Sequence, residues 1–300
     1  MDTHNKQAYL IIAHKDDMTF RTLLRMLDND KNDIFIHMDK KNKIYDPSET
    51  ESLVTHSSLY HSERSSVTWG GYSQINAELI LLKFATEKGH YQHYHLLSGQ
   101  DLPIQTQGDI QSFFEENDGK EFVGYDKPEF HFGDRVYYRW FLQEQIGRRS
   151  LLKVIQKPLV YFQRKLRIKR NTELRFQKGA NWFSITDELA RYVVSKEDWI
   201  REVFKDSFCA DEVFLQTVVE KSDAEGQPFK DNLYWKVFDD SHFQNMRCID
   251  WKRGLPYTWH VEDMEELIES PLMFARKFDC AVDAEIIKKI YEVYGKHTTK

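Results

Sequence analysis

Ala8-Tyr9-Leu10-Ile11-Ile12-Ala13 is a short apolar run of the kind that forms a buried β-strand. A helical pattern follows it, in which apolar residues are spaced three and four apart: Phe20, Leu23, Leu24 and Leu27. A second strand is expected at Asp33-Ile34-Phe35-Ile36-His37-Met38-Asp39, which ends in an acid. Strand, helix and strand in this order predict the start of a parallel sheet.

The same alternation continues along the chain. Ser73 is placed to cap a helix, and the apolar face expected for this helix contains Ile75, Leu79, Leu82 and Phe84. The run His93-Tyr94-His95-Leu96-Leu97 predicts a further strand that ends at Ser98-Gly99-Gln100-Asp101. We therefore predict an α/β fold with a mainly parallel central sheet flanked by helices. Ligands of such sheets bind at the carboxyl ends of strands, so we expect His14, Asp39 and Asp101 along one edge.

The second half of the chain is less regular. A strand is expected from Ala180 to Thr186, and helices follow to about Lys221. The stretch from Met246 to Trp251 suggests another strand, and Asp283 to Tyr294 a closing helix. Because the sequence contains no internal repeat, low-complexity tract or linker, we expect residues 1–300 to form a single domain.

Composition narrows the class of protein. Hydrophobic residues make up 41% and charged residues 30%, the usual balance of a soluble globular protein. No apolar run approaches the ~20 residues of a membrane-spanning helix, and the N-terminus lacks the pattern of a secretory signal. With only three scattered cysteines, a cytoplasmic protein with reduced thiols is expected. The net charge of −6 argues against nucleic acid as a general partner.

Residues 145–172 form a basic segment that contains no acid. Its basic residues are interleaved with apolar ones and are Arg148, Arg149, Lys153, Lys157, Arg164, Lys165, Arg167, Lys169 and Arg170. This mixture suits peripheral contact with an anionic membrane surface. A solvated basic helix and a patch for an anionic acceptor are the alternatives.

Patterns for metals and common cofactors are weak or missing. The sequence contains neither the Gly-x-Gly-x-x-Gly fingerprint of dinucleotide enzymes nor a nucleotide-triphosphate loop. His93 and His95 would share a strand face, but no nearby acid completes a ligand set. Asp28-Asn29-Asp30 has the Asp-x-Asp pattern of many nucleotide-sugar enzymes, but it stands where a polar turn is expected. Asp39-Lys40-Lys41 is a poor cation site, so we expect no metal cofactor.

Two short segments carry residues suited to catalysis. In Phe208-Cys209-Ala210-Asp211-Glu212-Val213-Phe214-Leu215, two acids stand at the start of an expected helix, where the helix dipole keeps a carboxylate ionised. Such a group can accept a proton from a hydroxyl, although acids also open helices for stability alone. In Phe274-Ala275-Arg276-Lys277-Phe278-Asp279, two cations lie between aromatic residues. This pattern is typical of an amphipathic surface turn, or it places Lys277 or Arg276 where it can neutralise a diphosphate.

Seven blocks stand in a fixed order between Ala8 and about Asp283. They are Leu10–Lys15, Ile36–Lys41, Val67–Ser73, Tyr94–Ile104, Gly179–Ser184, Asp211-Glu212 and Phe274–Asp279. In this order they resemble the core-2/I-branching β-1,6-N-acetylglucosaminyltransferase family, which includes the peptide O-xylosyltransferases. The resemblance implies a GT-A-type fold, a nucleotide-sugar donor, inversion at the anomeric carbon and catalysis without a metal.

The resemblance also implies roles for single residues. By position, Glu212 matches the catalytic base. Residues implied on the donor side are Asp39 and Trp69 near the nucleoside, His14 close by, and Lys277 at the diphosphate. Arg253 and Arg276 are the candidates for a second cation at the diphosphate. Residues implied on the acceptor side are Asp101 and Trp251.

The expected function is transfer of a sugar, by family default N-acetylglucosamine, from a UDP-sugar to a hydroxyl of a glycan acceptor. The sequence carries neither the membrane anchor nor the many disulfides of the animal enzymes, which suggests a bacterial member. We expect such an enzyme to act on a lipid-linked oligosaccharide at the inner face of the plasma membrane, in surface polysaccharide synthesis. One alternative is a non-catalytic module that binds a nucleotide or glycan. The other is a peripheral membrane protein that acts mainly through its basic segment.

Overall fold

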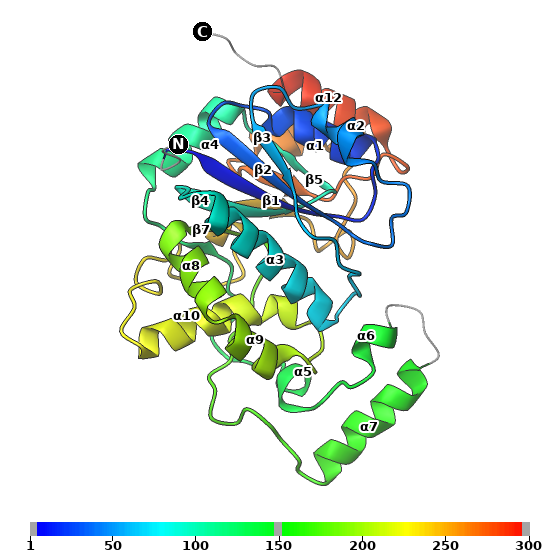
Figure 1. Ribbon diagram of the computed structural model, residues 1–300, viewed down its shortest axis with the longest axis vertical. Helices are drawn as coiled ribbons and strands as arrows, with labels where there is room; N and C mark the ends of the chain where they lie inside the picture. Colours follow the sequence, from blue (N-terminus) through cyan, green and yellow to red (C-terminus); the bar gives the residue numbers. More distant parts are fainter. Residues whose placement is uncertain (1–4, 147–151, 296–300) are drawn as a thin grey trace.

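The computed structural model describes residues 5–146 and 152–295. Its central element is a six-stranded sheet in the order β3-β2-β1-β4-β7-β6 (Figure 1). These strands are β3 (Ser58–His61), β2 (Asn32–Met38), β1 (Gln7–Ala13), β4 (His93–Ser98), β7 (Phe183–Thr186) and β6 (Phe122–Val123). The first four run parallel, and β7 pairs antiparallel with both β4 and β6. The prediction of an α/β fold with a mainly parallel central sheet is confirmed.

A smaller, three-stranded sheet has the order β5-β9-β8. Its strands are β5 (Asp101–Pro103), β9 (Phe274–Arg276) and β8 (Arg247–Ile249). The strand expected from Met246 to Trp251 is therefore real but shorter, and it belongs to this second sheet. Antiparallel pairing of β5 with β9 sets Asp101 directly opposite Arg276.

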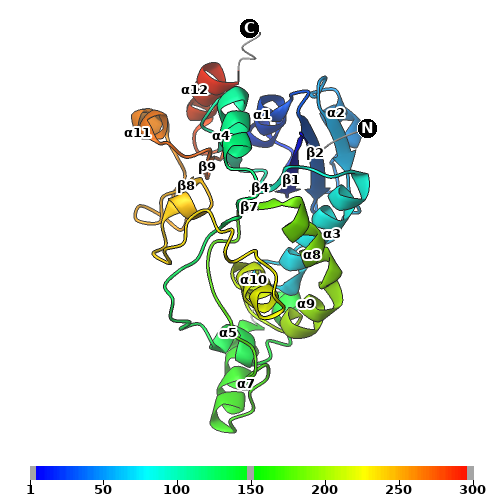
Figure 2. The same ribbon diagram turned by 90° about the vertical axis from the view of Figure 1, so that its left-hand side faces the viewer.

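Helices cover both faces of the central sheet (Figure 2). In chain order, the α-helices of the described residues are α1 (Met18–Leu27), α2 (Pro47–Glu51), α3 (Tyr72–Lys88), α4 (Gln107–Glu116), α5 (Asp134–Tyr137), α6 (Gln143–Ile146), α7 (Lys153–Lys165), α8 (Asp187–Ser195), α9 (Glu197–Phe204), α10 (Phe214–Ala224), α11 (Met264–Glu269) and α12 (Ala284–Tyr294). One buried apolar cluster joins the sheet to α3, α8, α9 and α10. A second cluster joins it to α1, α4, α11, α12 and the small sheet.

The start of α3 differs from the expectation. The helix begins at Tyr72, and Gly71 occupies the cap position without a side-chain bond. Ser73 does not cap the helix, because it already lies inside the first turn. Its hydroxyl accepts the N–H of Thr68 (2.8 Å), and its own N–H donates to Glu144 (2.8 Å).

The carboxyl ends of β1, β2 and β4 meet at one edge, as predicted. In the register, Ala13 pairs with Met38 and Ile12 with Ser98. The N–H of Asp39 donates to the carbonyl of Ala13 (2.8 Å), which places it immediately beside the end of β1. His14 follows the same strand end, so these two predicted donor-side residues do converge.

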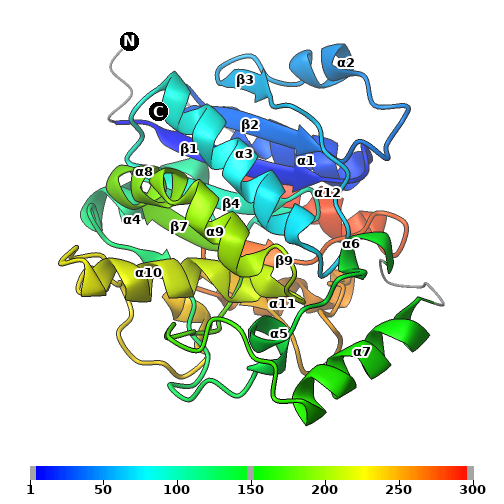
Figure 3. The same cartoon turned by 60° about the horizontal axis from the view of Figure 1, so that its bottom comes forward.

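Helix α7 lies at the margin of the molecule, away from both sheets (Figures 1 and 3). It lies within the basic segment 145–172, of which residues 147–151 lie outside the described residues. Within the described ranges, none of the helices combines the length and apolarity that a membrane span requires.

Candidate active site

Glu212, the predicted base, lies at the end of a short 3-10 helix, η1 (Ala210–Glu212). Helix α10 begins only at Phe214. The expectation that Asp211 and Glu212 open the α-helix is therefore wrong, since both belong to the tighter turn that precedes it.

Two backbone hydrogen bonds from distant segments explain this turn. The N–H of Cys209 donates to the carbonyl of Gly70 (2.9 Å), and the N–H of Gly179 donates to the carbonyl of Glu212 (2.9 Å). The chain is thus pinned on both sides of the acids before the α-helix starts, which fixes the direction of the Glu212 side chain.

The two carboxylate oxygens of Glu212 have different surroundings. Oε2 lies 2.7 Å from a guanidinium nitrogen of Arg135 and 3.5 Å from the ammonium of Lys178. Among the described residues, Oε1 has neither an ion pair nor a hydrogen bond, and the side chain is 34% exposed. Two cations therefore hold one oxygen while the other stays available to a substrate. Neither Arg135 nor Lys178 was predicted from the sequence.

Asp211 points the other way, into the protein. One of its oxygens accepts the side-chain amide of Gln74 (3.1 Å), whose carbonyl oxygen accepts the N–H of Gly70. Burial, followed by the charge of Glu212, raises the pKa of Asp211 to about 7. Burial, followed by the charge of Asp211, also raises the pKa of Glu78 on α3 well above its usual range. Asp211 therefore supports the turn instead of facing a substrate.

Aromatic rings extend from the base turn toward Trp69. Trp69 is 43% exposed and packs edge-on against Phe208, with ring centroids 5.8 Å apart. On its other side Phe208 stacks on Trp140 at 4.7 Å. The structure thus brings Trp69, predicted at the donor side, close to the turn that carries Glu212.

A second group of predicted residues gathers at the carboxyl ends of the strands. Burial, followed by the charge of Lys15, lowers the pKa of His14. The charge of Asp39 raises this pKa, and the charge of Arg276 lowers it. One carboxylate oxygen of Asp39 accepts the N–H of Lys41 (2.9 Å). Asp39 and Arg276 therefore each lie within electrostatic range of His14.

Asp101 is only 1% exposed and is occupied by internal partners. It forms an ion pair with Arg276 (2.7 Å) and accepts the N–H of Ser98 (2.8 Å). The Arg276 guanidinium also lies over the ring of Trp182, 4.4 Å from its centroid. The structure therefore shows Asp101 as an internal partner that orients the Arg276 guanidinium.

The remaining predicted cations, Arg253 and Lys277, flank Tyr257. Arg253 stacks on the ring of Tyr257 (4.3 Å) and is surrounded by three carboxylates, those of Asp250, Asp263 and Glu266. The N–H of Lys277 donates to the carbonyl of Tyr257 (3.3 Å). In the described part of the chain, no carboxylate lies within ion-pair distance of the Lys277 ammonium, which leaves its charge available. Trp251 is exposed in the loop that carries Arg253.

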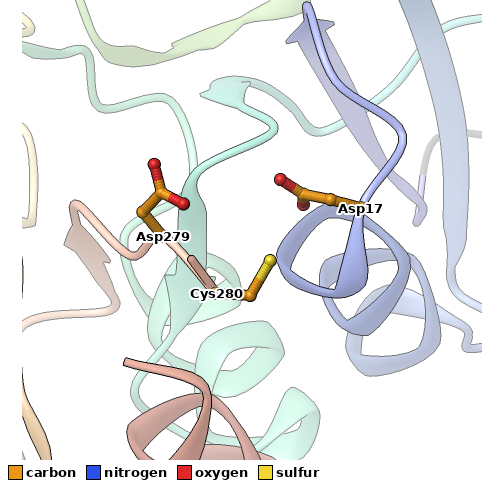
Figure 4. Close-up of side chains that lie close together, drawn as sticks. All are labelled: Asp17, Asp279 and Cys280. Carbon is orange, nitrogen blue, oxygen red and sulfur yellow. The ribbon is translucent and has the colours of Figure 1, made fainter. Parts of the chain in front are cut away.

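Asp17, Asp279 and Cys280 are potential metal ligands that lie close together, with ligand atoms within 4.8 Å of one another (Figure 4). Both carboxylates already have internal partners. Asp17 caps α1 through the N–H of Phe20, and Asp279 pairs with Lys15 (3.3 Å). These contacts account for the positions of both acids.

Comparison with known proteins supplies the family. The model described as Core-2/I-Branching enzyme matches residues 7–269. Xylosyltransferase 2 of Rattus norvegicus is 23% identical over 315 residues, which cover 97% of this chain and 34% of that protein. The N-acetyllactosaminide beta-1,6-N-acetylglucosaminyl-transferase of Homo sapiens is 23% identical over 91% of this chain and 68% of its own length. The chain thus spans about a third of the length of the xylosyltransferase.

A solved structure was also compared. Mouse xyloside xylosyltransferase 1 in its apo form has 9% sequence identity and a TM-score of 0.36, over 92% of this chain and 98% of its own. This likeness is too distant to transfer any residue.

Proposed function

Since this chain belongs to the core-2/I-branching enzyme family, we propose that it is a glycosyltransferase that moves a sugar from a nucleotide-sugar donor to a hydroxyl of a glycan acceptor. One observation carries the proposal. Glu212 has one oxygen held by Arg135 and Lys178, while the other has no partner among the described residues. A positioned carboxylate with one free oxygen is what a general base needs.

In the proposed reaction, Oε1 of Glu212 takes the proton of the acceptor hydroxyl. The acceptor oxygen then attacks the anomeric carbon, and the bond to the diphosphate breaks on the opposite face, which inverts the configuration. Lys277 stabilises the negative charge that grows on the leaving diphosphate. Lys277 suits this role because the described residues supply no carboxylate within 4.0 Å of its ammonium.

Glu212→Gln tests the base. The amide keeps the shape of the side chain but cannot accept the proton, so turnover should fall by ~10²–10⁴-fold. The dissociation constant of UDP, measured by calorimetry, should stay within about twofold of the wild-type value. The matched control is Asp198→Asn, which alters an exposed acid on α9 and should leave both quantities unchanged. Turnover close to wild type in Glu212→Gln would rule out this role.

Metal independence belongs to the same proposal. In the cluster of Asp17, Asp279 and Cys280, Asp17 accepts the N–H of Phe20 and Asp279 pairs with Lys15. The cations at the strand ends can supply the positive charge that a metal would otherwise supply. Turnover should therefore survive EDTA. Complete loss of activity that Mn²⁺ restores would overturn metal independence but not the assignment of Glu212.

For the donor we propose UDP-N-acetylglucosamine, with UDP-xylose as the alternative to test first, because relatives bearing the names of both activities match this chain. A panel of UDP-sugars, screened for slow hydrolysis to UDP, would identify the donor without an acceptor. UDP release from any of them would also exclude the competing hypothesis of a non-catalytic nucleotide- or glycan-binding module.

For the acceptor we propose a lipid-linked oligosaccharide at the inner face of a bacterial plasma membrane, on the pathway to a surface polysaccharide. The basic segment 145–172, which contains no acid, supports this proposal because it suits a site of action beside anionic lipid. Acceptor extension that proceeds equally well on a detergent-free soluble glycan would argue against it.

A further inference from the structure

Helix α7 turns an apolar face away from the protein. Its inward side carries Gln156 and Val160, which are buried, and Gln163, which is partly buried. The rest of its surface, through the residue that follows the helix, carries exposed apolar residues, namely Val154, Ile155, Leu159, Tyr161, Phe162 and Leu166. Phe162 is 57% exposed and Leu166 67%. A monomeric protein rarely exposes so much apolar surface on a single helix, so this face needs an occupant.

The charges around this face identify the occupant. Exposed cations accompany it on α7 and in the turn that follows, namely Lys157, Lys165, Arg167 and Lys169. The sequence of residues 145–172 supplies no acid to neutralise them. Two copies of this face would bring like charges together, whereas an anionic lipid surface attracts the cations and accepts the apolar side chains.

We infer that α7 is a docking helix that lies flat on an anionic bilayer, with Phe162 and Leu166 inserted at the headgroup boundary and the exposed cations against lipid headgroups. The second half of the inference is that docking acts on the candidate active site. This half rests on the proposed function, whereas the docking itself does not.

The segment from α5 to α6, residues 134–146, connects the two places. On the side of α7, both atoms of the Gln163 side-chain amide bond to the backbone of Arg139, at 2.9 and 3.0 Å. The side chain of Gln156 accepts the N–H of Leu142 (3.2 Å), and Arg164 pairs with Asp134. The helix is thus held to this segment by side-chain bonds along its inward face.

The same segment holds the candidate active site. Arg135 pairs with Oε2 of Glu212 (2.7 Å), and the side chain of Gln143 donates to the carbonyl of Trp69 (3.1 Å). Glu144 accepts the N–H of Ser73 at the start of α3 (2.8 Å). A bilayer that holds α7 in place would therefore also restrict Arg135 and the Trp69 turn to their observed positions.

Vesicle sedimentation tests the docking. Wild-type protein should sediment with vesicles of phosphatidylserine and phosphatidylcholine, more weakly as salt rises, and poorly with phosphatidylcholine alone. The double variant Phe162→Ser, Leu166→Ser should lose roughly tenfold or more in partition coefficient. The matched control Ile44→Ser, Val293→Ser removes exposed apolar side chains elsewhere and should bind as wild type does.

Two results would overturn the docking. One is wild-type protein that fails to sediment with anionic vesicles at low salt. The other is a dimer in solution that dissociates in the Phe162→Ser, Leu166→Ser variant, because a second copy of the chain would then cover the face. Both variants change exposed side chains, so their far-ultraviolet circular dichroism should match that of wild type.

The coupling is tested by adding the same vesicles to a UDP-sugar hydrolysis assay. Wild-type turnover should rise several-fold, while the Phe162→Ser, Leu166→Ser variant keeps the basal rate and does not respond. Emission from Trp140, isolated as the difference between wild type and Trp140→Phe, should change on docking because Trp140 lies in the connecting segment. Docking that changes neither turnover nor Trp140 emission would overturn the coupling. Sedimentation and a Trp140 response without any UDP release would instead contradict the proposed function.

Discussion

Asp211 and Glu212 are adjacent acids with opposite environments. Glu212 is held by Arg135 and Lys178 at the protein surface, whereas Asp211 is buried and accepts a single amide from Gln74. The turn η1 produces this difference, since it directs successive side chains to different sides. One acid is thereby free to react while its neighbour ties the base turn to the start of α3.

A pH dependence follows for Asp211. Its pKa rises from 3.8 to about 7 on folding, mainly through burial. Between these values the folded chain keeps a proton that the unfolded chain has released, so this residue costs stability as pH rises from about 4 to 7. Asp211→Asn removes that cost. The free energy of unfolding of the variant, relative to wild type, should therefore increase with pH across this window and level off above it.

Urea denaturation at several pH values measures this difference. Asp198→Asn is the control, because it changes an exposed acid and should give a difference that does not vary with pH. A pH-independent difference for Asp211→Asn would show that its carboxyl group is ionised in the folded protein throughout the range.

At the scale of elements, the turn before α3 joins the donor side to the base. Gly70 has a φ of +71°, and its carbonyl accepts the N–H of Cys209. A Cβ at Gly70 would lie 3.0 Å from the ring of Phe208 and 3.1 Å from the Cys209 sulfur. The turn thus depends on glycine both for its conformation and for the close approach of the base turn.

Comparing Gly70→Ala with Gly119→Ala separates the cost of the backbone conformation from the cost of crowding. Gly119 has a φ of +74°, but nothing lies within 4 Å of its Cβ position. Gly119→Ala should therefore cost only about 1 kcal/mol of stability, the conformational term, and leave UDP binding unchanged. Gly70→Ala should cost roughly 1–3 kcal/mol more, because of crowding, and weaken UDP binding. Equal effects of the two variants, measured by denaturation and calorimetry, would contradict the structural role of this turn.

The strands and helices of the central sheet could be predicted from local sequence patterns. The side chains that come from distant segments to contact Glu212 could not. β1, α1 and β2 follow from apolar periodicity alone, and they bring His14 and Asp39 to one edge. Arg135 is 77 residues from Glu212 and lies in a region of short helices and loops that has no periodic pattern. Even a correct assignment of every helix and strand would not have revealed its pairing with the base.

Side-chain pairing also joined residues that the sequence analysis had treated separately. Asp101 and Arg276 were expected on the acceptor and donor sides, but the register of β5 with β9 makes them partners. The end of α10 could be predicted to within a few residues. The turn η1 could not, because hydrogen bonds to the carbonyl of Gly70 and from the N–H of Gly179 hold it in place. Contacts of this kind depend on the tertiary fold and leave no local signal.

At the scale of the whole molecule, the candidate site draws on both sides of the central sheet. Glu212 and Trp69 adjoin elements of the apolar cluster that contains α3 and α10. Lys277 continues from β9, which packs in the other cluster. A donor that contacts both groups would link two separately packed halves, so its binding should stabilise the fold against unfolding.

Thermal unfolding in the presence of UDP tests this linkage. At one hundred times its dissociation constant, a ligand that binds only the folded state adds about 2.7 kcal/mol, which for a chain of this size corresponds to roughly 5 °C in the midpoint. Lys277→Met should lose most of this shift, because the ammonium has no internal partner among the described residues and is available to the diphosphate. The control Lys288→Met changes an exposed lysine on α12 and should keep the shift.

Comparison of Arg253→Met with Arg276→Met then identifies the second cation at the diphosphate, since loss of that cation reduces the shift. A full shift in Lys277→Met would place the diphosphate elsewhere and remove the proposed link between the two halves.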